Sequence, residues 1–174
     1  MLTGGTAARM GGVAKADLVL DGVTFLERSL AAVAAADEVV VVGTPTTTSV
    51  PVVWAMEDPP GGGPAAGLLA GVAALSQPVD LLVVLAVDMP FVTAATVARL
   101  VDAAAAEGAD GGVLVDGDAR RQLAAAYRRA ALQRSGEAFG LSMHALVDGL
   151  RLASVPAVGD EARDVDRWAD LGPV

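Results

Sequence analysis

The chain has 174 residues, which is long enough for one domain with a single sizeable core. The absence of cysteine excludes a disulfide framework, a thiolate metal site and a cysteine nucleophile, and the net charge of −9 argues against a nucleic-acid partner. No apolar run approaches the ~20 residues that span a bilayer, and no cationic leader is visible. We therefore expect one soluble, cytoplasmic domain over residues 1–174, with no membrane or nucleic-acid partner.

A glycine-rich stretch opens the chain and ends at Lys15, the only lysine. Its glycines allow successive N–H groups to converge on phosphate oxygens, while Arg9 and Lys15 supply positive charge. The spacing matches neither a Walker A loop nor the Gly-x-Gly-x-x-Gly fingerprint. The stretch predicts a phosphate-binding loop, and the alternative is an irregular loop with a stray lysine. Only Met1 and Leu2 precede Thr3, so either the first strand is short or residues upstream are absent from this chain.

Apolar runs of strand length then alternate with longer helical stretches. This alternation predicts an α/β fold with a mostly parallel sheet. The expected helices cover 24–36, 64–75 and 93–107, and the stretch 129–150 is broken by glycines into two pieces; the expected strands cover 39–42, 50–54, 81–87, 112–115, 123–127 and 152–155.

Asp88 follows the longest apolar run of the chain, 81–87. In open α/β sheets, ligands bind at the carboxyl ends of strands, and Mg²⁺ takes one or two carboxylates together with substrate phosphates. Asp88 is therefore a candidate metal ligand, with a capping or turn aspartate as the alternative. Asp164 and Asp166 lie two residues apart, so both face one side of an extended segment and could complete the site. Alternatively, Asp166 caps 167–171 and Asp164 is solvated.

The loop 57–63 combines two prolines with three glycines and leads into the helix expected at 64–75. The N-terminus of that helix offers unpaired N–H groups to an anion or a base edge, although an ordinary connecting loop is the alternative. Asp116-Gly117-Asp118 predicts a hairpin turn. Arg120 and Arg121 could reach an anionic acceptor or simply be solvated, and His144 is interpreted as structural.

The order of these motifs resembles that of the MobA-like nucleotidyltransferases, specifically the molybdenum cofactor guanylyltransferase group. The motifs are Leu-x-Gly-Gly-x-x-x-Arg-Met-Gly-Gly-x-x-Lys, then Gly-Pro-x-x-Gly-Leu, then a strand ending in Asp-x-Pro, then Asp-Val-Asp. The resemblance covers 2–90 well and 110–171 loosely. It implies a Rossmann-like, three-layer α/β/α sandwich of the glycosyltransferase-A-like type. It also implies transfer of GMP from GTP to molybdopterin, with Mg²⁺ and release of pyrophosphate.

The same resemblance assigns roles to individual residues. Lys15 would neutralise charge at the attacked α-phosphate, Asp88 would hold Mg²⁺ with Asp164 or Asp166, and transient partners would deliver or receive the cofactor. The expected nucleotide site comprises Leu2, Thr3, Gly4, Gly5, Arg9, Gly11 and Lys15 around the triphosphate, with Asp58 near the guanine or ribose and Gly63 and Gly67 in the base-side loop.

Base choice rests mainly on Gly4, because a missing Cβ there leaves room for a purine, as in guanylyl-type relatives. Arg167-Trp168 and Arg121-Gln122-Leu123 depart from the family pattern and bear on the acceptor. Three alternatives stay open: a cytidylyltransferase for the same pterin, a sugar-phosphate nucleotidyltransferase, and a non-catalytic nucleotide-binding module.

Overall fold

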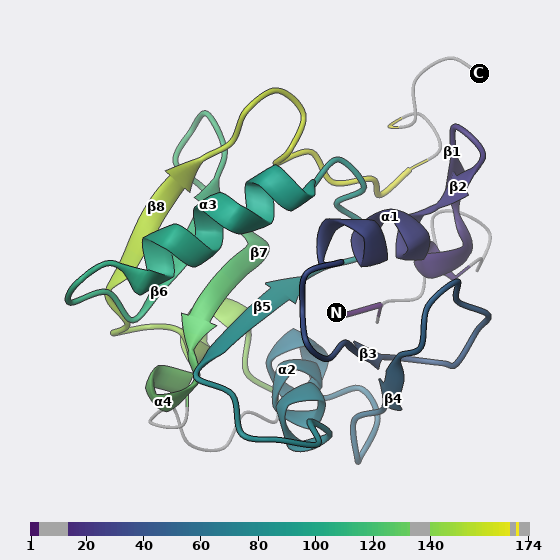
Figure 1. The fold of residues 1–174 in the computed structure, drawn as a ribbon, viewed down its shortest axis with the longest axis horizontal. Coiled ribbons are helices and arrows are strands. Elements are labelled where there is room, and N and C mark those ends of the chain that lie inside the picture. The colour runs from purple at the N-terminus through teal and green to yellow at the C-terminus, as the bar shows by residue number, and fades with distance from the viewer. Residues whose placement is uncertain (4–13, 133–139, 168–169, 171–174) are drawn as a thin grey trace.

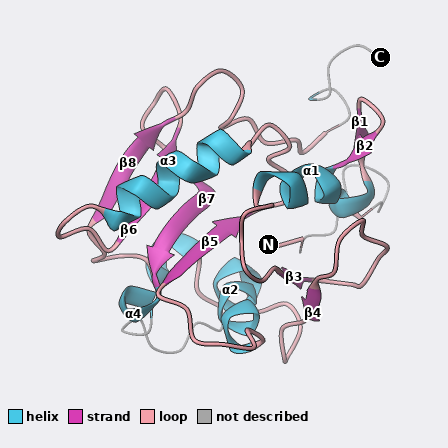
Figure 2. Cartoon of the chain, in the orientation of Figure 1, coloured by secondary structure: helices cyan, strands magenta, loops and turns pink. Residues whose placement is uncertain are grey.

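The computed structural model describes residues 1–3, 14–132, 140–167 and 170. Strands and helices alternate along most of the chain, as predicted (Figures 1 and 2). In chain order they are η2 (Lys15–Asp17), β1 (Val19–Leu20), β2 (Val23–Thr24), α1 (Phe25–Ala32), β3 (Val40–Val42), β4 (Val53–Ala55), α2 (Gly63–Ala73), β5 (Leu81–Leu85), α3 (Ala94–Ala105), β6 (Gly111–Val115), β7 (Arg121–Arg128), α4 (Arg129–Leu132), α5 (Met143–Leu146) and β8 (Leu152–Pro156). No helix in the described part of the chain is both long and apolar enough to cross a membrane.

Residues 1–3 join a two-stranded sheet, β3-β4, to a four-stranded sheet of order β5-β7-β6-β8. The Leu2 N–H donates to the Leu85 carbonyl at 2.9 Å, and the Thr3 N–H donates to the Val42 carbonyl at 3.1 Å. Residues 1–3 therefore run between β3 and β5. β3 pairs with β4, β6 pairs with β8 and Leu2 bridges both sheets in the parallel sense. β7 is antiparallel to β6, to which a turn connects it, and also to β5.

Side chains alternate between the two faces of the sheet, as the pleat requires. Leu82 and Val84 of β5 belong to the core cluster that includes α2, α4 and α5, whereas Leu85 packs with residues of α1 and α3. Helices thus cover both faces (Figure 1), and the predicted α/β/α arrangement is confirmed.

Several boundaries differ from the sequence prediction for local reasons. The strand expected at 50–54 lies at Val53–Ala55 instead. It begins after Pro51, which has no N–H to donate to a ladder. The β1–β2 hairpin was not predicted, although its Asp21-Gly22 turn, with φ of 52° and 79°, is a strong hairpin signal. The helix expected at 24–36 ends at Ala32, and the Thr24 side chain caps its start.

Gly112 lies where α3 packs closely on β6. A Cβ at this position would stand 2.7 Å from the Leu100 carbonyl oxygen and 2.8 Å from the Ala103 Cβ. We expect Gly112→Ala to lower the free energy of unfolding by about 1–3 kcal/mol, because the backbone contact cannot yield without moving α3. Urea unfolding measures this loss. Gly117→Ala is the control, since a Cβ at Gly117 meets nothing within 4 Å. Equal midpoints for the two variants would contradict the prediction.

Candidate active site

A cleft of about 970 Å³ lies at the carboxyl ends of β3 and β5. This is the edge at which open α/β sheets bind ligands. Thr3 and Gly43 line one part of the cleft, and Asp88 lines another. The loop before α2, the first turns of α2, the start of β7 and the C-terminal segment also line the cleft. Their lining residues include Met56, Glu57, Pro60, Gly61, Gly63, Pro64, Gly67, Gln122, Leu123 and Asp164.

Lys15 connects two segments that are far apart in the sequence. Its Nζ donates to Asp88 Oδ2 at 2.8 Å and to Asp166 Oδ1 at 2.5 Å. The Lys15 side chain is only 12% exposed, whereas those of Asp88 and Asp166 are 27% and 47% exposed. The structure thus brings together three residues that the sequence analysis assigned to one site.

The backbone fixes the C-terminal segment next to Asp88. The Val165 N–H donates to the Asp88 carbonyl at 2.8 Å, and the Val165 side chain is fully buried in the core that includes Phe25 and Val87. Alternation then directs the side chains on either side of Val165 outward, so Asp164 lines the cleft and Asp166 meets Lys15.

Asp170 holds the backbone that follows Val165. Asp170 Oδ2 accepts hydrogen bonds from the N–H groups of Asp166, at 3.0 Å, and Arg167, at 2.7 Å. The Asp166 carboxylate meets Lys15, and capping of the segment 167–171 by Asp166 stays a prediction.

The ion pairs keep Lys15 charged. Burial by itself lowers the pKa of the Lys15 ammonium, but hydrogen bonds from it to Asp166 and Asp88 and the charges of these carboxylates outweigh that effect. The pKa of Lys15 is raised as a result, so the ammonium stays protonated at neutral pH and presents a fixed positive charge next to Asp88, which lines the cleft.

Two carboxylates that converge on one cation also suit a divalent metal. Mg²⁺ is usually held by one or two carboxylates, with phosphate and water oxygens completing its shell. Among the described residues there is no group of three or more His, Asp or Glu side chains placed to hold a metal. The donor set around Asp88 and Asp166 thus fits a metal that arrives with a phosphate ligand, and metal binding by Asp88, Asp164 and Asp166 stays a prediction.

The remaining predicted nucleotide-site residues fall into three groups. Leu2, Thr3, Gly63 and Gly67 line the cleft. Asp58 is exposed and is not among the described residues that line it. Gly4, Gly5, Arg9 and Gly11 lie outside the described residues.

Glu57 is a cleft residue that the sequence analysis missed. Its Oε2 is buried and has no hydrogen-bond partner among the residues that the structure describes, and its Oε1 lies 3.2 Å from where a Cβ at Gly67 would stand. The close approach explains why a glycine occupies position 67. The available signal was the position of Glu57 as the first carboxylate after the apolar run of β4.

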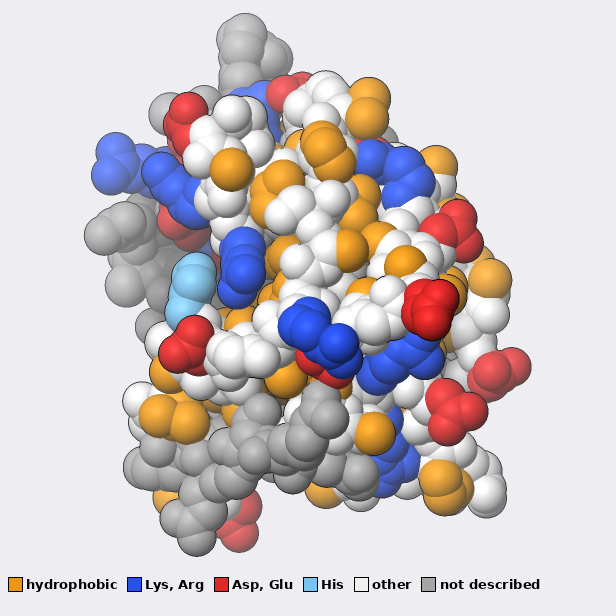
Figure 3. All heavy atoms as spheres, turned by 90° about the vertical axis from the view of Figure 1, so that its left-hand side faces the viewer, with side chains coloured by type: hydrophobic (Ala, Val, Ile, Leu, Met, Phe, Trp, Pro, Cys, Tyr) orange, Lys and Arg blue, Asp and Glu red, His pale blue; other side chains and the backbone are white. Residues whose placement is uncertain are grey.

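The turn between β6 and β7 positions Gln122, which the sequence analysis named only within a departure from the family pattern. Asp116 Oδ2 accepts from Gln122 Nε2 at 3.1 Å, and Asp116 Oδ1 accepts from the Arg120 N–H at 2.9 Å. Gln122 lines the cleft, whereas Arg120 and Arg121 are exposed. His144, the single histidine, lies at the surface on α5 (Figure 3).

Several solved structures share this fold. Molybdopterin-guanine dinucleotide biosynthesis protein A from Archaeoglobus fulgidus is 21% identical over 98% of this chain and 92% of that chain, with a TM-score of 0.75. The 2-C-methyl-D-erythritol 4-phosphate cytidylyltransferase from Thermus thermophilus is 24% identical over 90% of each chain, with a TM-score of 0.66. Rv0371c from Mycobacterium tuberculosis, in a complex with manganese, is 19% identical over 97% of this chain and 91% of that chain, with a TM-score of 0.69. No curated protein matches the sequence.

The match to a family model places this α/β chain among the nucleotidyltransferases. The chain belongs to the MobA-like NTP transferase domain family, whose sequence model matches residues 1–149. The predicted family resemblance is thereby confirmed. Asp164 and Asp166 lie beyond the matched region, so their place at the site comes from the structure.

Proposed function

We propose that this enzyme transfers GMP from GTP to molybdopterin with release of pyrophosphate. The observation that carries the proposal is Lys15, held between Asp88 and Asp166 beside a cleft at the carboxyl edge of the sheet. The family match supports nucleotidyl transfer, and the likeness to the Archaeoglobus fulgidus protein supports the pterin acceptor.

The proposed step exchanges one phosphoanhydride bond for another. A phosphate oxygen of molybdopterin attacks the α-phosphorus of GTP, a new P–O–P bond forms, and the bond from the α-phosphorus to the bridging oxygen breaks. The electron pair of that bond leaves with pyrophosphate. No side chain needs to act as a nucleophile, because phosphoryl transfer depends mainly on positioning and charge stabilisation.

The residues of this chain would contribute charge and position. Lys15 would donate hydrogen bonds to an oxygen of the attacked phosphate, exchanging one carboxylate partner for the substrate. Asp88 and Asp166 would hold Mg²⁺, which supplies Lewis-acid stabilisation of the phosphate charge when it is bound. Gly63 and Gly67 would line the nucleobase side of the cleft beside α2, and Leu2 and Thr3 would line it as well.

Calorimetric titration of GTP and CTP in the presence of Mg²⁺ tests the choice of base. We expect GTP to bind at least about tenfold more tightly than CTP, a difference of ~1.4 kcal/mol. Tighter binding of CTP would favour the cytidylyl alternative and contradict the guanylyl proposal.

A second assay follows pyrophosphate release with and without molybdopterin. Release that requires both GTP and the pterin is the expected result. Tight GTP binding without any release would instead identify a non-catalytic nucleotide-binding module, and release with a sugar phosphate alone would replace the proposed acceptor.

A further inference from the structure

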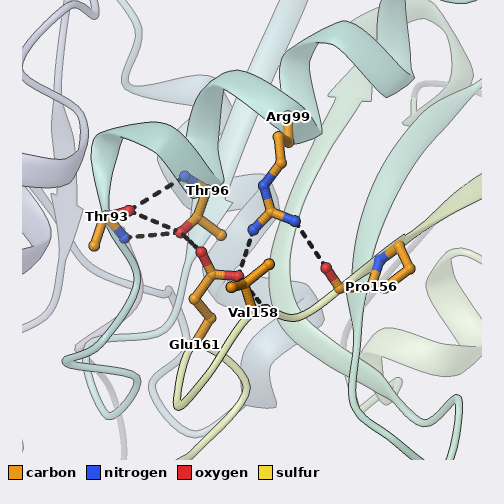
Figure 4. A network of polar contacts seen from close by, with 6 residues as sticks. All are labelled: Thr93, Thr96, Arg99, Pro156, Val158 and Glu161. Carbon is orange, nitrogen blue, oxygen red and sulfur yellow. Dashed lines mark hydrogen bonds and ion pairs between the residues drawn. The ribbon is translucent and has the colours of Figure 1, made fainter.

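Glu161 is a buried carboxylate outside the cleft, with only 9% of its surface exposed. Its Oε1 accepts a hydrogen bond from the Thr96 hydroxyl at 2.6 Å. Its Oε2 accepts from the Val158 N–H at 2.8 Å and also from the Arg99 guanidinium, as Figure 4 shows. Both carboxylate oxygens are therefore occupied, and all of their partners lie either on α3 or on the loop that follows β8.

The α3 side of this network is itself held rigidly. Thr93 and Thr96 form a capping box at the start of α3, with the Thr93 N–H donating to Thr96 Oγ1 at 3.0 Å. Arg99 donates a second hydrogen bond, at 2.8 Å, to the carbonyl of Pro156 at the end of β8. Glu161 thus ties the loop after β8 to a helix whose first turns cannot shift independently (Figure 4).

The ionised form of Glu161 is the one this network favours. Burial by itself raises the pKa of the Glu161 carboxyl, but the hydrogen bonds from Thr96, Val158 and Arg99 and the Arg99 charge outweigh it, and the pKa is lowered. A carboxylate with these three donors is a strong anchor for the chain that carries it.

A short stretch of chain connects this anchor to the site. Arg163 stacks its guanidinium over the Phe91 ring at 5.4 Å, and Val165 is buried and hydrogen-bonded to the Asp88 carbonyl. The next residue is Asp166, whose side chain is 47% exposed. The Asp166 carboxylate can reach Lys15 only while the backbone at 164–166 keeps its place, and Glu161 and Val165 anchor that backbone.

We propose that Glu161 is a positioning residue, which holds the loop 157–166 on α3 so that Asp166 meets Lys15. The effect of Glu161 on catalysis rests on the proposed function. Its effect on the Lys15–Asp166 ion pair is independent of that function. The ion pair can therefore be tested without nucleotide, metal or pterin.

Lys15 is the only lysine, so protein labelled with ¹⁵N-lysine gives a single side-chain ammonium signal in NMR spectra. The measured quantity is the exchange rate of the Nζ protons with water near neutral pH. We expect Asp166→Asn and Glu161→Gln each to accelerate exchange on the order of tenfold, because each weakens the same charge-assisted hydrogen bond. If Glu161 acts through Asp166, the double variant should exchange no faster than the faster single variant.

Asp110→Asn is a matched control. Asp110 is 8% exposed, and its Oδ2 accepts from the Arg151 N–H at 3.0 Å and from Arg151 Nε at 3.2 Å. Asp110 is thus a buried carboxylate of the same kind. It ties the chain before β8 to the start of β6, and it does not contact the loop after β8 through these bonds. The exchange rate at Lys15 should stay at the wild-type value in this variant.

Three results would overturn the inference: wild-type exchange in Glu161→Gln, equal acceleration in Asp110→Asn, or additive effects in the double variant. If Glu161→Gln fails to fold, Arg99→Gln replaces it, with a smaller acceleration expected, and unchanged exchange in that variant also overturns the inference. Accelerated exchange in an enzyme that proves unable to transfer GMP would contradict the proposed function alone.

Discussion

Replacing Lys15 by alanine is expected to reduce kcat for nucleotidyl transfer by about 10²–10³-fold, the usual effect of removing one preorganised donor to developing charge. The Lys15 ammonium is shielded from water and is held in place by the carboxylates of Asp88 and Asp166. The rate of pyrophosphate release at saturating GTP measures the loss.

Lys15→Arg separates charge from shape in this prediction. Arginine keeps the positive charge but presents a planar fork, which cannot replace a compact ammonium between two carboxylates and a phosphate. We expect the arginine variant to retain GTP binding better than the alanine variant while still losing most of the turnover. Full activity in both variants would contradict the assignment.

The same ion pairs predict how stability depends on pH. The pKa of Lys15 is raised above its ordinary value of 10.5, so the folded state binds the proton more tightly than the unfolded chain. The stabilisation is therefore fully present below pH 10.5 and is lost as pH rises through the folded-state pKa. Compared with wild type, Lys15→Ala should lose stability at neutral pH, and the difference should shrink only in strongly alkaline solution.

Replacing Asp88 by asparagine is expected to have the second large effect. The amide keeps the shape of the side chain but removes the charge that Mg²⁺ needs, so we expect kcat to fall by about 10²–10³-fold. Much higher Mg²⁺ concentrations should also be needed for half-maximal activity. Pyrophosphate release measured against Mg²⁺ concentration gives both values.

The control for Asp88→Asn is Asp118→Asn, which removes one negative charge from an exposed turn residue. It should leave the Mg²⁺ dependence at the wild-type value. An unaltered Mg²⁺ dependence in Asp88→Asn would show that this carboxylate is not a metal ligand, and the site would then need another explanation.

Much of the fold could be predicted because its signals are local. Apolar runs such as that before Asp88 form strands that are buried on both faces, and Thr24 and Thr93 begin helices because their hydroxyls accept from nearby N–H groups. The position of Asp88 at the carboxyl edge followed from the same logic. The hairpin turn predicted at 116–118 implied the antiparallel pairing of β6 and β7. The place of β7 between β5 and β6 was not predicted, because strand order depends on pairing between distant segments.

The candidate site was predicted only in part, for the same reason. The sequence could nominate Lys15, Asp88, Asp164 and Asp166, but nothing local distinguishes Asp164 from Asp166. The sequence also could not show that Glu57, and not Asp58, lines the cleft. Neighbouring side chains on an extended chain point in opposite directions, and the register of the strand decides which of them faces the cleft.

By itself, the sequence determined the alternation of strands and helices and the candidate charges, because periodicity, capping and turn chemistry act over a few residues. Only the tertiary structure decided that Asp166 pairs with Lys15 across a separation of 151 residues, and that Glu161 anchors the loop leading to it. Burial of Val165 in the core and hydrogen bonds to α3 fix these contacts, and both come into existence only when the whole sheet and its helices pack together.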